Sequence, residues 1–317
     1  MRPSDTPLQI HWDSCDRQRW TRLLLQAGKS SLEQSWAYGE AIAGHARQSL
    51  HRGLLVRGED PLALVQVFAR HLAPLGCLNR VLRGPVWIEP ELDDQMRLDL
   101  LRAIRASFRL RRRELLLWLP ELPDDPSSEA ALRSLGSRRM VTGYSSAWLD
   151  LSRSEGELRA GLHVKWRNAL KSAERGKLRI KASHGGRVMA ESLARYDSFR
   201  RGKRFLGPDG GFIARIAEAG QRDKETLLLN AEFGGEAVAG IVLVRHGASA
   251  TYFAGWTSPE GRRHNAHNLL LWQGICRLQA TGTQWLDLGG INPAAPGVAR
   301  FKLGLGGEVF TLTGTYI

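Results

Sequence analysis

Residues 226–244, TLLLNAEFGGEAVAGIVLV, contain two apolar runs on either side of Gly234-Gly-Glu. Apolar runs that flank a short glycine-containing turn predict a β-hairpin. Downstream, the pattern indicates a strand at Ala250–Trp256, a helix over about 266–281 and a strand at Gln284–Leu288. The second half of the chain is therefore expected to run hairpin, strand, helix, strand.

The first half of the chain repeats this order. A hairpin, a strand, a helix and a strand are expected at residues 54–68, 81–88, 92–110 and 114–119. The turn of this hairpin is Gly58-Glu-Asp-Pro, and the last strand is the apolar run Glu114–Leu119. The match between the halves indicates duplication of one α/β unit.

The two halves meet in the middle of the chain. Pro120–Ser128 is rich in Pro, Asp and Ser and predicts a loop. The apolar run Ser146–Leu151 then predicts a strand, and we expect the domain boundary near Asp150. The expected domains are residues 1–150 and 151–317.

The second domain is expected to open with one long helix. Apolar residues recur at helical spacing at Leu158, Leu162, Trp166 and Leu170. Ser154, with a glutamate three residues later, has the pattern of a capping box at the start of this helix.

The chain carries a large positive charge. Its 317 residues have a formal net charge of +13 and a pI near 10.3. Such a surplus attracts polyanions such as RNA, nucleotides or anionic lipid head groups, although an arginine-favouring genome is an alternative explanation. The sequence has no long apolar run and no secretory h-region, so we expect a cytoplasmic protein without a transmembrane segment. Peripheral membrane contact is left open.

Several classes of catalytic site are not indicated. The three cysteines, Cys15, Cys77 and Cys276, have no Cys-x-x-Cys spacing, so neither a disulfide framework nor a zinc site is expected. The sequence also lacks a P-loop, a His-x-x-x-His pair and a Gly-x-Ser-x-Gly elbow. We therefore expect no bound metal or cofactor, and an acyl group that arrives already activated.

Three segments carry a family resemblance. They are Lys165–Leu178, Tyr252–Trp272, and Trp285–Gly290 followed by Gly297–Gly307 with its Phe-Lys-x-x-x-Gly-Gly sequence. Together they resemble the FemABX peptidyltransferases and their acetyltransferase-like (GNAT, BioF2-like) relatives, over most of the chain from about Gln34 onward. The segment between the helix near Tyr196 and the strand at 226 has no room for the long two-helix arm of some family members.

This resemblance implies a fold and a reaction. The fold is two tandem GNAT-like domains, each a mixed β-sheet flanked by helices, with the acceptor on the first and the donor on the second. The reaction is transfer of an amino acid from aminoacyl-tRNA to a small-molecule or peptide amine, by a monomer that binds charged tRNA. The alternatives are an acyl-CoA-dependent N-acyltransferase acting on an amino sugar or polysaccharide precursor, and a non-catalytic RNA- or phosphate-binding module.

The resemblance also suggests catalytic residues. Lys302, in the Phe-Lys motif, is expected to stabilise the oxyanion formed when an amine attacks an ester or thioester, or to hold a donor phosphate. Its alternative is an exposed lysine at a strand edge. Asp287, before Gly289-Gly290, is expected to orient the amine or accept its proton, or else to cap the turn after its strand.

Donor binding is assigned to cationic residues. Arg262 and Arg263 lie in the turn where an acetyltransferase holds the coenzyme A pyrophosphate at a helix N-terminus. Ala266 and Asn268 replace the glycines of that turn, which argues against coenzyme A. Further phosphate contacts are expected from two basic segments, through Lys165, Arg167 and Arg204. Solvated basic surfaces are the alternative in each case.

Acceptor binding is assigned mainly to the first domain. Gln34, Trp36 and Tyr38 belong to a Gln-Ser-aromatic segment similar to the family's entry segment, and Tyr252 of the second domain is assigned with them. A helix start capped by Ser35 is the alternative.

Overall fold

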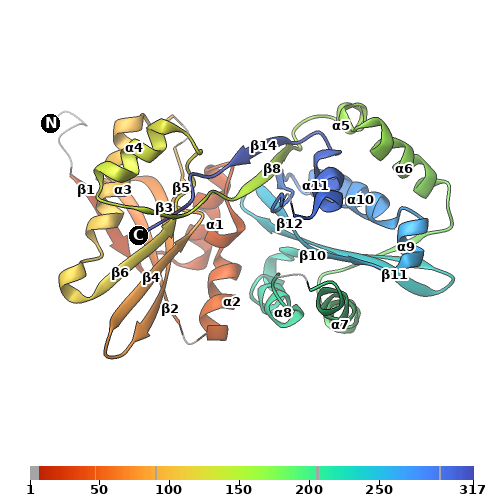
Figure 1. Cartoon of the computed structure of the whole chain (residues 1–317), viewed down its shortest axis with the longest axis horizontal. Coiled ribbons are helices and arrows are strands. Elements are labelled where there is room, and N and C mark those ends of the chain that lie inside the picture. Colours follow the sequence, from red (N-terminus) through yellow and green to blue (C-terminus); the bar gives the residue numbers. More distant parts are fainter. Residues whose placement is uncertain (1–6, 47, 90, 205–206, 293) are drawn as a thin grey trace. The chain divides into compact units, whose positions relative to one another are not determined.

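The computed structural model describes residues 7–46, 48–89, 91–204, 207–292 and 294–317 (Figure 1). The chain divides into two compact units. The first contains the described residues up to Ser145 together with His246–Ala248 and Phe310–Ile317, and the second contains the remainder. The strand β8 (Ser145–Asp150) pairs within the second sheet, so this division begins before the predicted limit at Asp150.

The first unit is built on a mixed sheet. Its strands lie in the order β1-β2-β3-β4-β6-β15-β7, with β5 beside β3. Their bounds are β1 Leu8–Trp12, β2 Ser49–Arg57, β3 Asp60–Leu72, β4 Gly76–Leu82, β5 Val86–Trp87, β6 Glu114–Leu119, β7 Arg139–Val141 and β15 Thr315–Tyr316. The helices are α1 Arg17–Gln26, α2 Trp36–Ala46, α3 Asp94–Ala106 and α4 Pro126–Ser134.

The second unit is also built on a mixed sheet, in the order β14-β8-β13-β12-β11-β10-β9. Its other strands are β9 Arg179–Ser183, β10 Thr226–Phe233, β11 Glu236–His246, β12 Ser249–Thr257, β13 Trp285–Asp287 and β14 Glu308–Thr311. Its helices are α5 Glu155–Gly161, α6 Val164–Glu174, α7 Gly186–Gly202, α8 Gly210–Ala219, α9 Pro259–Arg263, α10 Ala266–Ala280 and α11 Pro296–Leu303. Among the described residues, no helix is long and apolar enough to cross a bilayer.

The predicted repeat is visible in the strand pairing. The hairpin β2-β3 is followed by β4, and a crossover through α3 leads to β6, which runs parallel to β4. In the second unit β10-β11 is followed by β12, and a crossover through α10 leads to β13, parallel to β12. The predicted fold class, two tandem α/β units with mixed sheets, is confirmed.

Helices cover both faces of the second sheet. In Figure 1, α7 and α8 lie on one face, and α6 and α10 lie on the other. The main core of this unit forms where Leu229, Ile241 and Leu243 of the sheet meet Leu270 and Ile275 of α10, all of them nearly inaccessible to solvent. Burying each such side chain contributes roughly 1.5–3 kcal/mol, so this core holds the sheet against α10.

Two sequence predictions about helices were wrong. The predicted loop at 120–128 ends early, because Asp125 caps α4 by accepting a hydrogen bond from the Ser128 N–H (2.7 Å). The predicted long helix after Ser154 is two helices, α5 and α6, although its capping box is confirmed. The break lies at Leu162–His163, where the His163 N–H donates to the Gly304 carbonyl (2.9 Å) instead of continuing the helix.

Candidate functional site

The two parallel strands of the second sheet separate at one end. They pair at Ser249–Trp285, Ala250–Leu286 and Thr251–Asp287, and then β13 stops while β12 continues to Thr257. The chain turns away from the sheet at Gly289, whose φ of +71° favours glycine. The side chains that gather at these diverging strand ends form the candidate site, because ligands in α/β sheets bind outside the carboxyl ends of strands.

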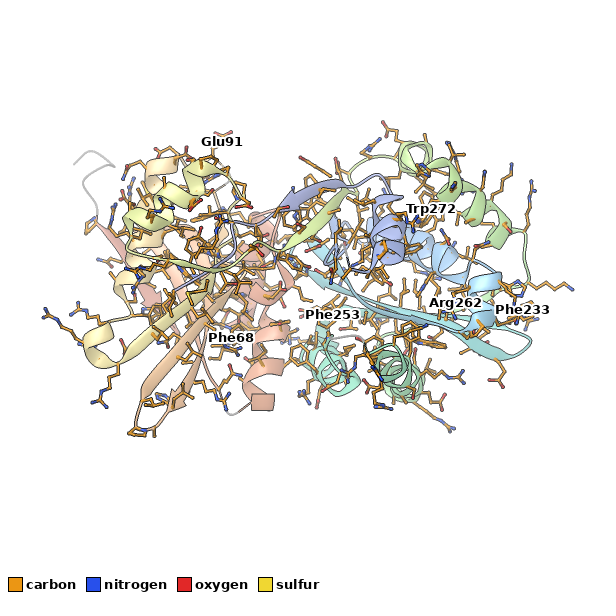
Figure 2. All side chains as sticks on the ribbon, viewed as in Figure 1. Phe68, Glu91, Phe233, Phe253, Arg262 and Trp272 are labelled. Atoms are coloured by element: carbon orange, nitrogen blue, oxygen red, sulfur yellow. The ribbon has the colours of Figure 1, made fainter. Side chains whose placement is uncertain are left out.

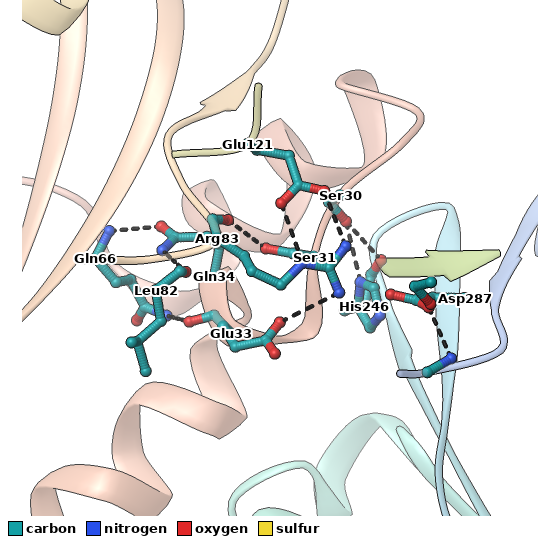
Figure 3. Close-up of polar contacts among 12 residues, drawn as sticks. Ser30, Ser31, Glu33, Gln34, Gln66, Leu82, Arg83, Glu121, His246 and Asp287 are labelled. Atoms are coloured by element: carbon teal, nitrogen blue, oxygen red, sulfur yellow. Dashed lines mark hydrogen bonds and ion pairs between the residues drawn. The ribbon is translucent and has the colours of Figure 1, made fainter. Parts of the chain in front are cut away.

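Asp287 lies at this point and is fully buried. Its carboxylate accepts hydrogen bonds from the Ser146 hydroxyl and from the Gly289 N–H, the latter at 2.8 Å (Figure 3). It therefore caps the turn after β13, which is one of the two roles that the sequence suggested. Its role as a proton acceptor stays a prediction.

Lys302 reaches the same point from α11. It lies on a helix and is only 8% exposed, so it is not an exposed lysine at a strand edge. Its ammonium donates to the Gly290 carbonyl (Nζ–O 2.8 Å) and lies 5.7 Å from the centroid of the Tyr252 ring. Burial lowers the pKa of Lys302 to about 8, against the opposing effect of the Asp287 charge. The side chain is therefore mostly charged at neutral pH.

Tyr252 belongs to this second-unit cluster. Burial raises the pKa of its hydroxyl well above the usual range, so the group is a neutral O–H. The hydroxyl and His267 Nε2 both lie next to Gly255, where an added Cβ would be 3.1 Å from Nε2. Sequence reasoning missed His267, although its place at the start of the α10 helix, two residues after Asn265, was a signal.

Four backbone amides of the turn before α10 are engaged within the turn itself. The short helix α9 occupies it, and its backbone N–H groups are satisfied locally: Gly261 by Ser258 Oγ, Arg262 by the Ser258 carbonyl, His264 by Glu260 and Asn265 by Arg262. A pyrophosphate cradle needs such groups unpaired and a close approach that glycine permits. Ala266, fully buried, stands at the first position of α10 instead.

The two arginines of this turn differ in their partners. Arg263 forms an ion pair with Glu260, which also binds His264 (2.9 Å). The His264 ring in turn stacks on Phe233, with ring centroids 4.1 Å apart. Arg262 is exposed and lies with Phe233 at the same end of the second unit (Figure 2).

Arg262 lines a groove of about 620 Å³ between α7 and the end of β12. Its other cations are Arg195 and Lys203, and its aromatic side chains are Phe199 and Trp256. The Arg195 guanidinium lies over the Trp256 ring (5.8 Å). No acidic side chain is among the described lining residues. The groove therefore suits an anionic ligand with a planar group.

The remaining predicted donor residues lie apart from this groove lining. Lys165 is exposed on α6, and Arg167, half-buried, donates to the Ala160 carbonyl (3.5 Å). Arg204 is exposed after α7, with a φ of +50°. Their phosphate contacts stay predictions.

Arg215 is a further residue that sequence reasoning missed. It lies on α8 with its guanidinium 5.8 Å from the Phe212 ring centroid. Its Nε and one Nη are shielded from solvent and have no hydrogen-bond partner among the described residues. A guanidinium in this state is suited to an anionic group of a ligand.

Gln34 is a structural residue of the first unit. Its side-chain amide donates to the Leu82 carbonyl (2.8 Å) and accepts from the Gln66 N–H (2.6 Å), and the residue is fully buried (Figure 3). Next to it, Arg83 makes two hydrogen bonds to Glu121, at 2.8 and 3.1 Å. The Gln34 contacts fix the segment that leads into α2, whereas the Arg83–Glu121 pair joins the segments that follow β4 and β6.

Trp36 and Tyr38 lie at the start of α2. The Arg52 guanidinium stacks 3.4 Å from the centroid of the Trp36 ring. The Tyr38 N–H donates to Ser35 Oγ (3.2 Å), so Ser35 does cap this helix. The Tyr38 ring packs edge-on against Phe68, and burial raises the pKa of its hydroxyl. Acceptor binding by Gln34, Trp36 and Tyr38 stays a prediction.

Cys276 lies on α10 and is partly buried. Burial raises the pKa of Cys276 to about 11, so its thiol is protonated at neutral pH. Among the described residues, no three His, Cys, Asp or Glu side chains are placed to hold a metal ion.

Part of the second unit matches a known domain family. Residues 159–303 match the acetyltransferase (GNAT) domain family. A sequence search of curated proteins gave no match.

Solved structures extend the likeness to the whole chain. The fold is similar to that of FemX (TM-score 0.80, 13% identity, 96% of each chain covered). It is also similar to a tandem GNAT protein from the clavulanic acid biosynthesis pathway (0.55, 14%, 98% of each chain). A third similar structure is L-PGS from Bacillus licheniformis (0.52, 12%, 91% of this chain and 92% of that one).

The chain is an α/β protein of two tandem units, and residues 159–303 match the acetyltransferase (GNAT) domain family. This match supports an acyltransferase, and the fold of the whole chain is similar to that of FemX. The resemblance to FemABX-like, GNAT-type proteins that the sequence motifs indicated is thus confirmed.

Proposed function

We propose that this chain is an N-acyltransferase that transfers an amino acid from aminoacyl-tRNA to an amine and forms an amide bond. The observation that carries the proposal is the buried Lys302 ammonium at the diverging ends of β12 and β13. Only one hydrogen bond of Nζ to a described residue is present, to Gly290, so further N–H groups can bind a ligand oxygen.

The proposed transfer needs two things from the protein: correct positioning of the two substrates and a positive charge beside the developing oxyanion. The amine nitrogen attacks the ester carbonyl carbon and a C–N bond forms. The Lys302 ammonium stabilises the negative charge that develops on the carbonyl oxygen. The C–O bond to the ribose then breaks, and the proton lost by the amine ends on the released hydroxyl. A preorganised cation at such an oxyanion contributes on the order of 10²–10³ in rate, and holding the two substrates together contributes more.

Two features favour a tRNA donor over coenzyme A. Four backbone amides of the turn at α9 are engaged locally, and the buried Ala266 stands where a glycine would let a pyrophosphate approach. The groove lined by Arg195, Lys203, Arg262 and the partly exposed Phe199 offers cations and an aromatic ring, which suit a phosphate backbone and a base. An acyl-CoA donor with an amino-sugar acceptor is the second candidate, supported by the GNAT domain match.

The test is a donor comparison. The protein is incubated with tRNAs charged with radiolabelled amino acids, or with labelled acetyl-CoA, and a bacterial small-molecule extract as acceptor. We expect ribonuclease-sensitive transfer of one amino acid, reduced about 10²–10³-fold by Lys302→Met. Lys224→Met, at an exposed lysine just before β10, is the matched control. Transfer from acetyl-CoA alone would overturn the tRNA proposal.

A further inference from the structure

The turn that follows β13 takes part in two polar contacts of the candidate site. On one side, the Gly289 N–H donates to the Asp287 carboxylate (2.8 Å). On the other side, the Gly290 carbonyl accepts a hydrogen bond from Lys302 Nζ (2.8 Å). Lys302 Nζ also lies 3.3 Å from the position that a Cβ on Gly289 would take. The ammonium is therefore packed against the turn, and its position depends on the conformation of the turn.

Ser146 of β8 contacts this turn from the neighbouring strand. β8 and β13 are antiparallel, with Trp148 opposite Asp287. One position further along, the Leu288 N–H donates to the Ala147 carbonyl (2.9 Å). The next position of β8 is Ser146, and its hydroxyl donates to the Asp287 carboxylate. Both of these side chains are fully buried, so the strand register brings a serine hydroxyl to a carboxylate that is shielded from solvent.

The Asp287 carboxylate depends on such donors because burial of a charge is costly unless the charge is hydrogen-bonded. A single oxygen, Oδ1, accepts from both Ser146 and the Gly289 N–H. Removal of the serine hydroxyl takes a donor from this oxygen, so the carboxylate and the turn bound to it can shift. A displacement of about 1 Å can reduce a catalytic rate on the order of 100-fold, because an oxyanion is stabilised only by a cation in the correct place.

We propose that Ser146 is a positioning residue: it fixes the Asp287 carboxylate and, through the turn at Gly289 and Gly290, holds the Lys302 ammonium where the oxyanion forms. This role rests on the proposed function and adds a residue of β8 to its machinery. Lys302 is the group that binds the substrate, whereas Ser146 acts only through the turn. The loss of Ser146 should therefore weaken the transition state and leave substrate binding nearly unchanged.

Ser145→Ala is the matched control for Ser146→Ala. The two serines are neighbours on β8, and successive side chains of a strand point to opposite faces. The Ser145 hydroxyl contacts Thr311 Oγ1 (2.8 Å) instead of Asp287. With the aminoacyl-tRNA that the donor comparison identifies, we expect Ser146→Ala to lower kcat about 10–100-fold and to change KM less than about threefold. Ser145→Ala should keep both values within about threefold.

Two further variants test how Ser146 acts. Ser146→Cys keeps a side chain of similar size with a weak S–H donor, so it should recover part of the lost kcat. Lys302→Met removes the ammonium, and adding Ser146→Ala to it should slow transfer by less than about threefold. Losses that multiply in the double variant overturn the positioning role, as does a kcat of Ser146→Ala equal to that of the natural protein. Ser146→Cys replaces Ser146→Ala in these comparisons if the alanine variant fails to fold.

A spectroscopic measurement distinguishes failure of this role from failure of the proposed function. In protein labelled with ¹³C-lysine, the ε-CH₂ signal of Lys302 is assigned by its absence from Lys302→Met. We expect this signal to shift in Ser146→Ala and to stay in place in Ser145→Ala. If no charged tRNA supports transfer but the shift is present, the proposed function alone is overturned. A Lys302 signal that is the same in Ser146→Ala and in the natural protein overturns the positioning role, whatever the transfer assay shows.

Discussion

At the scale of single residues, Lys302 carries a charge where charge is disfavoured. Burial lowers its pKa from the usual 10.5 to about 8, and the carboxylate of Asp287 limits the decrease. The protonated form, which an oxyanion needs, is therefore less favourable in the fold than in the unfolded chain, although it still predominates at neutral pH. The cost of the buried ammonium is present at neutral pH and declines as pH rises from 8 towards 10.5, where the folded protein loses this proton before the unfolded chain.

This balance predicts a pH dependence. If charged Lys302 supports transfer, kcat/KM should fall about tenfold per pH unit above pH 8, after correction for ionisation of the acceptor amine. Asp287→Asn removes the charge that raises the pKa of Lys302, so the fall should begin at lower pH.

A pH–rate profile of the two proteins checks this prediction. Asp99→Asn, at a partly exposed carboxylate of α3 that pairs with Arg102 in the first unit, is the control for the change in net charge. Profiles that coincide for all three proteins would contradict the role of Lys302 as the titrating group.

At the scale of elements, one position of β12 has no room for a side chain. Gly255 has a Tyr252 hydroxyl and a histidine nitrogen where a Cβ would lie. Gly156 of α5, in contrast, has nothing within 4 Å of the position where a Cβ would lie. Alanine substitutions at the two positions can therefore be compared. The comparison separates the effect of packing beside the candidate site from the general effect of glycine on backbone entropy.

We expect Gly255→Ala to lower the free energy of unfolding by about 1–3 kcal/mol, because the new methyl group crowds a filled site. Gly156→Ala should leave stability unchanged or raise it by up to about 1 kcal/mol, because alanine favours helix. Urea unfolding of both variants measures the difference. Equal effects at the two positions would show that the space beside Tyr252 and His267 is not tightly filled.

Helix boundaries also depended on contacts that local patterns do not contain. The apolar spacing after Ser154 continues past Leu162, and so predicts one helix. The chain nevertheless breaks there, because Leu162 is buried in an extended conformation and the next N–H binds the distant Gly304 carbonyl. In contrast, the capping box at Ser154 depends only on residues three apart, and it formed as predicted.

At the scale of the whole molecule, the net charge of +13 attracts polyanions but does not say where they bind. The groove beside α7 gives part of this charge a definite location, with Arg262 exposed in its lining. Other arginines are exposed elsewhere on the same unit. Arg187, for example, pairs with Glu191 on the surface of α7 and does not belong to the described lining of the groove.

The salt dependence of tRNA binding distinguishes a defined phosphate-binding site from non-specific attraction by the net charge. Arg262→Gln should weaken donor binding and reduce the slope of log K against log salt by about 0.7–0.9, the value for one phosphate contact. Arg187→Gln changes the net charge equally and should leave the slope almost unchanged. Titrations of labelled tRNA at several salt concentrations measure both. The same loss of slope in both variants would indicate binding without a dedicated groove.

The sequence by itself determined the order of elements, the duplication and the family resemblance, because hydrophobic periodicity, turn residues and capping boxes act over a few neighbouring residues. It also placed Lys302 and Asp287 in a motif. Only the tertiary structure decided what these residues became: Ser146, far away in the chain, binds Asp287, and α11 buries Lys302 beside Tyr252 and Gly290. Burial and charge depend on every segment packed around a group, so His267 and its unpaired nitrogen emerged only once α10, α11 and β12 were brought together.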